Sequence, residues 1–356
     1  MEPRPSRLAR YLLGVYGFLV VYASLYPFSG WRDQGLSPFE FLTAPWPRYL
    51  TTFDVAANVA AYLPLGLLVA LALAPRVHGA VACALAVALA ATTSVALEAA
   101  QSYLPDRVPS NIDLAANIAG GLAGAIAGLA TWRWVVVRGG LYALRDRLFR
   151  PGAGVDVGLV LIALWLVTQL HPETLLFGNG DLRSFLDASS AEFYAAETFA
   201  RVEAAVAATN VVALALLVAP LVNPGQPVRL LVLAAVAGAL AVHAGAFAIL
   251  LSPQETLAWL TPGATAGLAI GALVALVAVA LPRRWVVACC GLALMAATAL
   301  VNLAPENPYL AQSLAVWPQG HFLNFTGLTR LVSALWPFAT LAYLLASAAR
   351  ARGANE

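Results

Sequence analysis

Long apolar stretches separated by short polar segments run through the whole chain, and they are long enough to cross a membrane as helices. A spanning helix needs about 20 predominantly apolar residues. Ten segments approach that length, at residues 8–26, 53–74, 79–101, 113–131, 153–170, 203–222, 229–251, 262–281, 285–303 and 331–349. The pattern predicts an all-α, polytopic transmembrane helical bundle of about ten spans.

Composition supports this class and excludes several others. Hydrophobic residues make up 61% of the 356 residues and charged residues only 11%, which is typical of an integral membrane protein. The chain has no lysine, so it is neither a P-loop ATPase nor a Schiff-base enzyme. The near-neutral charge argues against a nucleic-acid partner. We expect no cofactor and no metal.

The arginines predict the orientation through the positive-inside rule, which favours arginine in cytoplasmic segments. With both termini in the cytoplasm, the inside holds Arg4, Arg7, Arg10, Arg76, Arg133, Arg138, Arg145, Arg147, Arg150, Arg229, Arg283, Arg284, Arg350 and Arg352, and the outside holds Arg32, Arg48, Arg107, Arg183, Arg201 and Arg330. The inside therefore holds more arginines than the outside, and the opposite orientation would reverse this difference. The long loops 27–52, 171–202 and 304–330 then lie outside.

Three regions are expected along the chain. Residues 1–131 form a four-span membrane domain, residues 132–152 a cytoplasmic linker at the membrane interface, and residues 153–356 a six-span region. The six-span region is either an extension or a degenerate repeat of the first four spans plus two, because Gly-rich and Asn-containing spans recur in the same order. The acidic residues of the first four spans are absent from the second set.

Polar residues interrupt the first spans at one depth. Two copies of an Asp-x-x-x-Asn motif open the second and fourth spans, as Asp54 with Asn58 and Asp113 with Asn117. A four-residue step keeps both side chains on one helix face, with Asn about 6 Å deeper than Asp. Ionisable groups inside a bilayer are costly, so they need partners or a function.

The intervening span brings further polar groups to the same level. It runs outward and ends with Ser94, Glu98 and Gln101 on one face, and the following loop supplies Arg107. We therefore predict one ligand-binding site near the outer membrane surface. Its residues are Asp54, Asn58, Ser94, Glu98, Gln101, Arg107, Asp113 and Asn117.

Two interpretations of these residues remain open. The aspartates each start a helix, where Asp is a common cap, so the set could be a structural polar network. Glu98 lies at the unfavourable end of its helix dipole, which favours an ion-paired or functional role. We also expect the kink at Pro64 and Gly66 to widen the outer end into a cleft.

These residues resemble the VanZ-like family of bacterial membrane proteins over residues 10–131. The matching motifs are Leu25-Tyr26-Pro27-Phe28 with Trp31, Asp54-x-x-x-Asn58 with Pro64-x-Gly66, Ser94-x-x-x-Glu98-x-x-Gln101, and Arg107 with Asp113-x-x-x-Asn117-x-x-Gly120. The resemblance implies a small helical domain of the bacterial inner membrane, associated with tolerance to glycopeptide antibiotics of the teicoplanin type. The chain departs from a minimal member by its additional C-terminal spans.

Three functions fit the sequence. The first, which we favour, is a non-enzymatic envelope protein whose outer cleft binds a membrane lipid, a lipid-linked glycan or a glycopeptide. The second is an enzyme acting on lipid-linked envelope precursors, with Glu98 as candidate catalytic base. The third is a lipid or glycan transporter.

Overall fold

A computed structural model describes residues 7–35, 37–47, 51–74, 76–77, 79–132, 140–171, 174–183, 196–251, 253–304 and 319–353. These parts are helical, and they contain an isolated β-bridge between Phe149 and Val222 but no strand. The all-α prediction is confirmed. Arg4, Arg48, Arg133 and Arg138, which the orientation prediction uses, lie outside the described residues.

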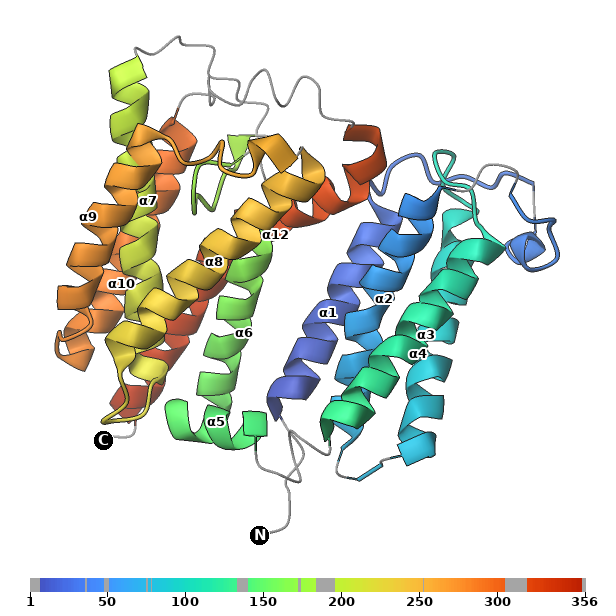
Figure 1. The fold of residues 1–356 in the computed structure, drawn as a ribbon, viewed down its shortest axis with the longest axis horizontal. Helices are drawn as coiled ribbons and strands as arrows, with labels where there is room; N and C mark the ends of the chain where they lie inside the picture. The colour runs from blue at the N-terminus through green and yellow to red at the C-terminus, as the bar shows by residue number, and fades with distance from the viewer. Residues whose placement is uncertain are drawn as a thin grey trace. The chain divides into compact units, whose positions relative to one another are not determined.

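Ten of the helices coincide with the ten predicted spans, and a short helix α5, Gly140–Leu148, lies between the fourth and fifth. The ten are α1 Arg7–Leu25, α2 Thr52–Leu73, α3 Gly79–Gln101, α4 Asn111–Trp132, α6 Ala153–Thr168, α7 Ala196–Val218, α8 Val228–Leu250, α9 Pro262–Ala278, α10 Arg283–Leu303 and α12 Gln319–Gly353 (Figure 1). Eight have the length and composition of membrane spans, whereas α6 and α9 have only 16 and 17 residues.

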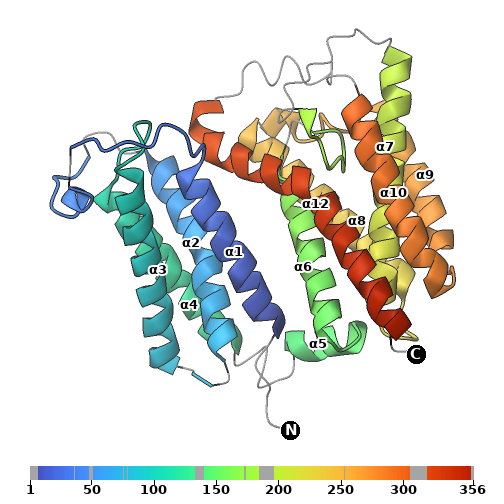
Figure 2. The same ribbon diagram turned by 180° about the vertical axis from the view of Figure 1, so that it is seen from behind.

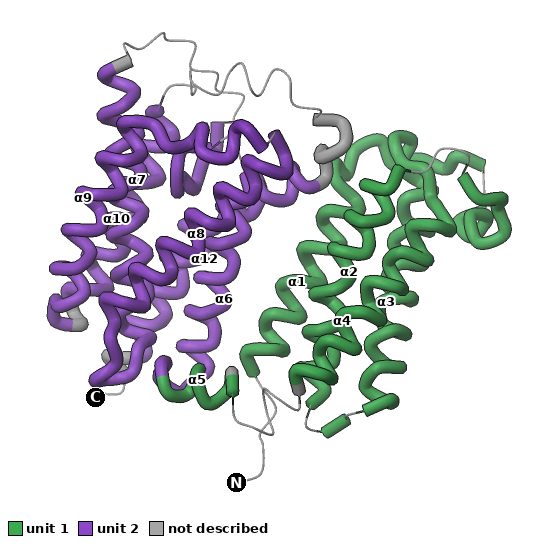
Figure 3. Tube along the Cα trace, in the orientation of Figure 1, with its two compact units in different colours: residues 1–147 green, residues 148–356 purple. Residues whose placement is uncertain are grey.

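The chain divides into two compact units, residues 1–147 and 148–356 (Figure 3). The boundary falls inside the segment 132–152 that the sequence analysis assigns to a linker. The four-span domain, the linker and the internal repeat remain predictions.

Unit 1 is a bundle of α1 to α4, which run alternately up and down (Figure 2). The connections 26–51 and 102–110 lie at the same end of this bundle, called here the loop end. Its apolar core is small, and Tyr62, Leu65, Ala90 and Leu97 are among its buried members. Little apolar volume therefore separates the helices, and close backbone packing has to hold them together.

Glycines provide that packing between α2 and α4. A Cβ atom added at Gly120 or Gly124 would collide with the backbone oxygen of Val59 or Leu63 respectively. Small residues spaced four apart allow such an approach between membrane helices. Gly66 takes part from the α2 side, since its added Cβ would collide with the backbone of Gly121. Gly66 thus serves close packing, and helix α2 continues through Pro64.

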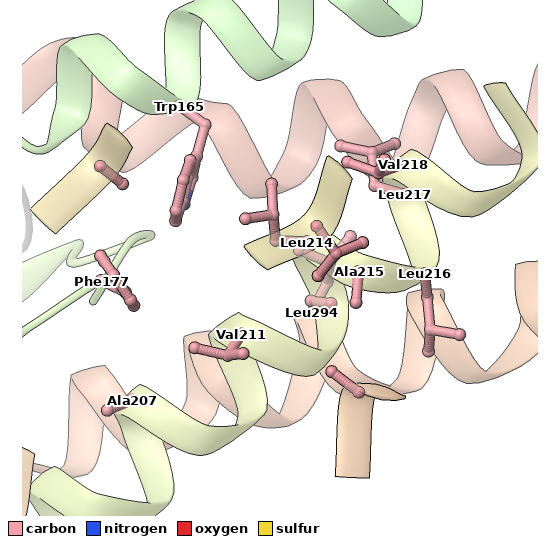
Figure 4. Packing of buried hydrophobic residues seen from close by; sticks show 14 of the residues in the cluster. Trp165, Phe177, Ala207, Val211, Leu214, Ala215, Leu216, Leu217, Val218 and Leu294 are labelled. Atoms are coloured by element: carbon pink, nitrogen blue, oxygen red, sulfur yellow. The ribbon is translucent and has the colours of Figure 1, made fainter. Parts of the chain in front are cut away.

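Unit 2 has the larger apolar core, built around α7. Figure 4 shows part of this cluster, with Val211, Leu214 and Leu217 of α7 packed near Leu294 of α10. The rings of Trp165 and Phe177 pack 5.1 Å apart beside them. Close packing between α7 and α9 repeats the α2–α4 pattern, because added Cβ atoms at Gly263, Gly267 and Gly271 would collide with the backbone of Ala200, Ala204 and Ala208.

Candidate functional site

The ends of α1, α3 and α4 are tied together at the loop end of unit 1. The Gln101 side-chain amide donates a hydrogen bond to the Ser24 carbonyl at 2.9 Å, and Arg107 Nη2 donates to the Tyr26 carbonyl at 2.6 Å. Asn111 Nδ2 donates to the Ala44 carbonyl at 2.7 Å. The two connections therefore form one layer over the helix ends, and Gln101 serves mainly to join α3 to α1.

Neither aspartate caps its helix. The Thr51 hydroxyl accepts the Asp54 N–H at 3.0 Å, so Thr51 is the N-cap of α2. The Ser110 hydroxyl accepts the N–H groups of Ile112 and Asp113 at the start of α4. Asp54 and Asp113 lie in the first turns, where a carboxylate is favourable. Their carboxylates remain available for contacts with other helices.

The first layer of the site contains one polar residue from each of α2, α3 and α4. Asn58 Nδ2 donates a hydrogen bond to Asp113 Oδ1 at 2.8 Å. The carboxyl groups of Asp113 and Glu98 interact electrostatically, as do those of Asp113 and Asp54. Glu98 is only 5% exposed and Asp54 is exposed, so the layer reaches from solvent into the bundle.

Glu98 also contacts the start of α4. Its Oε2 atom accepts the backbone N–H of Ser110 at 2.8 Å. A carboxylate at a helix N-terminus is stabilised by the unsatisfied N–H groups and the dipole there. Glu98 is therefore unfavourably placed for its own helix and favourably placed for α4, an arrangement that sequence alone could not reveal.

A second polar layer lies one turn deeper on all three helices. Asn117 Nδ2 donates to the Ser94 hydroxyl oxygen at 2.9 Å, and the side chains of Tyr62 and Ser94 are also hydrogen-bonded. All three residues are buried. The Oδ1 atom of Asn117 is buried and has no hydrogen-bond partner among the described residues. Such an acceptor costs about 1–3 kcal/mol if it stays unpaired.

On α2, α3 and α4 the next layer consists of small residues. Gly66, Ala90 and Gly121 each lie four residues further along their helices, and an added Cβ at Gly121 would touch the Ala90 side chain. Ala86 and Ala125 are fully buried one turn beyond. The polar groups therefore end two layers below the loops, on a floor of close-packed backbone.

Arg107 supplies positive charge near the first layer. Burial lowers the pKa of its guanidinium, and the carboxylates of Asp106 and Glu98 oppose that shift. The hydrogen bond to Tyr26 and these carboxylates together hold the side chain within the protein. Tyr26 belongs to the LYPF motif. In this motif the ring centroid of Phe28 lies 5.1 Å from that of Tyr22, and the Phe28 carbonyl accepts a hydrogen bond from the Trp31 indole N–H.

The structure thus places the predicted site residues at one end of unit 1. Contacts join Asn58, Ser94, Glu98, Asp113 and Asn117, Asp54 lies at their solvent side, and Gln101 and Arg107 join the site to α1. Sequence reasoning missed Tyr62 and Ser110. Tyr62 follows Asn58 by four residues, so the same helical spacing could have identified it. Ser110 gave no comparable signal.

Unit 2 has buried polar groups of its own. The Thr261 hydroxyl donates a hydrogen bond to the Glu203 carboxylate, which joins the start of α9 to α7. His243 Nδ1 lies 2.8 Å from the Gln169 carbonyl oxygen, and its ring packs against Phe247 and Trp259. The described residues include no group of three His, Cys, Asp or Glu side chains placed to hold a metal ion.

Comparison with known proteins gives one result for the N-terminal part. Residues 10–133 match the family model described as VanZ/LLP1. This match covers α1 to α4, about a third of the chain, and confirms the resemblance that the motifs indicate. No curated protein and no solved structure gives a match.

Proposed function

We propose that this integral membrane protein of the VanZ type binds the polar headgroup of an envelope lipid or lipid-linked glycan, or a glycopeptide, at the loop end of unit 1. In this proposal the protein lies in the bacterial cytoplasmic membrane with both termini inside, so the loop end faces the outside. Glycopeptide tolerance would then result from binding at this site.

The observation that carries the proposal is the pair of stacked polar layers with an unsatisfied acceptor in the deeper one. Three helices present carboxyl, carboxamide and hydroxyl groups to one another across about one helical turn, and Asn117 Oδ1 has no partner within the described residues. Buried polar groups are normally satisfied. A bound headgroup would supply the missing hydrogen bond.

Exposed aromatic side chains beside the site support a lipid ligand. Trp31, Phe39 and Trp46 of the connection between α1 and α2 are 47%, 54% and 75% exposed. Trp side chains concentrate at membrane–water interfaces, where lipid headgroups lie. The connection begins and ends at helices with the length and composition of membrane spans, so in this proposal the rings lie among the lipid headgroups.

Removing the carboxamides should release the ligand. We expect Asn58→Ala and Asn117→Ala to lower the amount of one co-purifying headgroup class about tenfold, an effect of about 1.4 kcal/mol. Asn117→Ala removes the unpaired acceptor, and Asn58→Ala removes the hydrogen bond that positions Asp113. Lipid extraction and mass spectrometry of the purified protein measure this. Tolerance to teicoplanin should fall in the same variants while their abundance in the membrane stays constant.

Asn210→Ala provides a matched control in unit 2. Asn210 is buried in α7, and its amide donates to the Val206 carbonyl of its own helix. This variant should keep the wild-type lipid profile. An unchanged profile in the Asn58 and Asn117 variants would contradict the proposal.

An enzymatic function is the second candidate, because Glu98 and Asp113 form a pair of interacting carboxyl groups. Such pairs can divide acid and base roles. Glu98→Gln distinguishes the two functions. If Glu98 is a catalytic base, the Glu98→Gln variant should almost completely lose product formation from a lipid-linked precursor. If the protein only binds the headgroup, the variant should retain it within about threefold, because the glutamine Oε can still accept the Ser110 N–H.

A transport path through unit 1 is disfavoured by the layer of Gly66, Ala90 and Gly121. The backbones of α2 and α4 touch at this level, and Gly66, Ala90 and Gly121 offer a polar headgroup no hydrogen-bonding side chain. The polar layers instead fit a site at the loop end, because their polar side chains stop at this level.

A further inference from the structure

The charges and hydrogen-bonding groups of the site identify the chemistry of its ligand, an inference that rests on the proposed binding function. We propose that the two polar layers bind a primary ammonium group. The two sources of such a group are an amine-bearing lipid headgroup and an amino sugar of a lipid-linked glycan or glycopeptide.

The first argument concerns charge. The three helices carry three carboxyl groups, those of Asp54, Glu98 and Asp113. The Asp113 carboxyl group interacts electrostatically with each of the other two. The arginine beside them, Arg107, also interacts with Asp106 and donates to the Tyr26 carbonyl. Among these groups the acidic ones outnumber the basic one, and the basic one already has partners. In this proposal a bound cation favours the ionised form of these carboxyl groups, whereas an anionic headgroup opposes it.

The second argument concerns hydrogen bonds. The amides of Asn58 and Asn117 donate inward, to Asp113 Oδ1 and to the Ser94 hydroxyl oxygen. Two acceptors are then proposed to meet the ligand: the second carboxylate oxygen of Asp113, and the buried Oδ1 of Asn117, which has no partner among the described residues. Asn117 is 4% exposed and lies one turn below Asp113 on the same helix face. An ammonium group has three donors and no acceptor, so it suits this arrangement.

The third argument is the shape of the polar region. Asp54 is exposed at the loops, Asp113 is half-buried, and Asn117 is buried one turn deeper. Acceptors thus continue from the surface to the floor formed by Gly66, Ala90 and Gly121. A small cationic group at the end of a longer molecule can reach Asn117 while the rest of that molecule remains at the membrane surface.

The test measures retention of defined lipids by the full-length protein. Protein is delipidated and then exposed, in native mass spectrometry, to phosphatidylethanolamine, phosphatidylcholine and phosphatidylglycerol with identical acyl chains. We expect retention of phosphatidylethanolamine at least tenfold above that of the other two, because only its headgroup carries a cationic N–H donor. Competition by glucosamine but not by N-acetylglucosamine would identify an amino sugar as the source instead.

Two isosteric variants test whether the amine binds at Asp113 and Asn117. Asp113→Asn keeps the acceptor for Asn58 but removes a charge, and should weaken binding of the amine probe about tenfold. Asn117→Asp adds a carboxylate at the buried acceptor and should preserve or strengthen binding of the amine probe. An anionic ligand would instead bind better to Asp113→Asn than to Asn117→Asp. Asp146→Asn, in α5, removes the same charge from an exposed side chain and should leave retention unchanged.

The possible outcomes distinguish a failure of the ammonium assignment from a failure of the proposed headgroup binding. Preferential retention of phosphatidylglycerol that is lost in Asn117→Ala would overturn the ammonium assignment and leave headgroup binding intact. Amine binding that Asp113→Asn does not affect would likewise overturn the assignment. Failure of every lipid and both sugars to bind would overturn the proposed function itself.

Discussion

Replacing Gly124 with alanine is expected to unfold unit 1, the largest single effect that the structure predicts. The added Cβ would collide with the Leu63 carbonyl oxygen and lie 2.8 Å from the Leu67 amide nitrogen. Backbone atoms in the middle of a helix cannot rotate aside as a side chain can, so α2 and α4 have to separate. Overpacking costs about 1–3 kcal/mol when side chains can adjust, and we expect at least about 3 kcal/mol here.

Thermal unfolding of the purified protein in detergent measures this, with Gly14→Ala as the control. Gly14 lies in α1 of the same unit, and an added Cβ there would meet no atom within 4 Å. That variant should unfold at the wild-type temperature or slightly above it, because alanine favours helix more than glycine. Equal unfolding temperatures of the two variants would show that α2 and α4 do not pack closely at Gly124.

Replacing Arg107 with methionine is expected to destabilise the loop end of unit 1 by about 2 kcal/mol. Its guanidinium holds the Tyr26 carbonyl and offsets the charge of Glu98, which also lies near Asp113. Removing one member of a partly buried charge pair leaves the other uncompensated, and this costs more than the pair contributes when intact. Methionine keeps much of the apolar stem, so the effect comes mainly from charge.

A double-mutant cycle tests that cause. In a Glu98→Gln background, Arg107→Met should cost less than half as much, since no glutamate charge remains to be offset. Arg32→Met, at an exposed arginine in the neighbouring connection, should change the unfolding temperature little. If Arg107→Met has the same effect in the wild-type protein and in the Glu98→Gln background, the two side chains are independent and our account of the loop end is incorrect.

Much of the fold could be predicted from the chain alone. Helices form at each of the ten apolar stretches. Their ends differ from the predicted ones by at most four residues, except that α7 begins at residue 196 instead of 203 and α12 at residue 319 instead of 331. Length and apolarity determine this directly, because backbone groups in a membrane must be satisfied within the helix. The structure adds that glycines of α4 allow a close backbone contact with α2.

The candidate site was only partly predictable. Periodicity placed Asp113 with Asn117, and Ser94 with Glu98, on shared faces. Which groups pair across helices depends on the rotation and depth of each helix, and the pattern within one helix does not fix these. Sequence reasoning left capping by the aspartates open as one interpretation and missed Thr51 and Ser110, which perform it. It also connected Gly66 only with a kink, and the structure shows that Gly66 is a packing contact.

The sequence by itself determined that this protein is a helical membrane protein with acidic and amide side chains at the ends of its second, third and fourth spans. Its motifs also identified the VanZ-like segment. Only the tertiary structure decided that these side chains form two stacked layers, that Glu98 meets the N-terminus of α4, and that small residues close the site below. The physical reason is that composition and periodicity act within one helix, whereas a site depends on distances between helices, which packing alone sets.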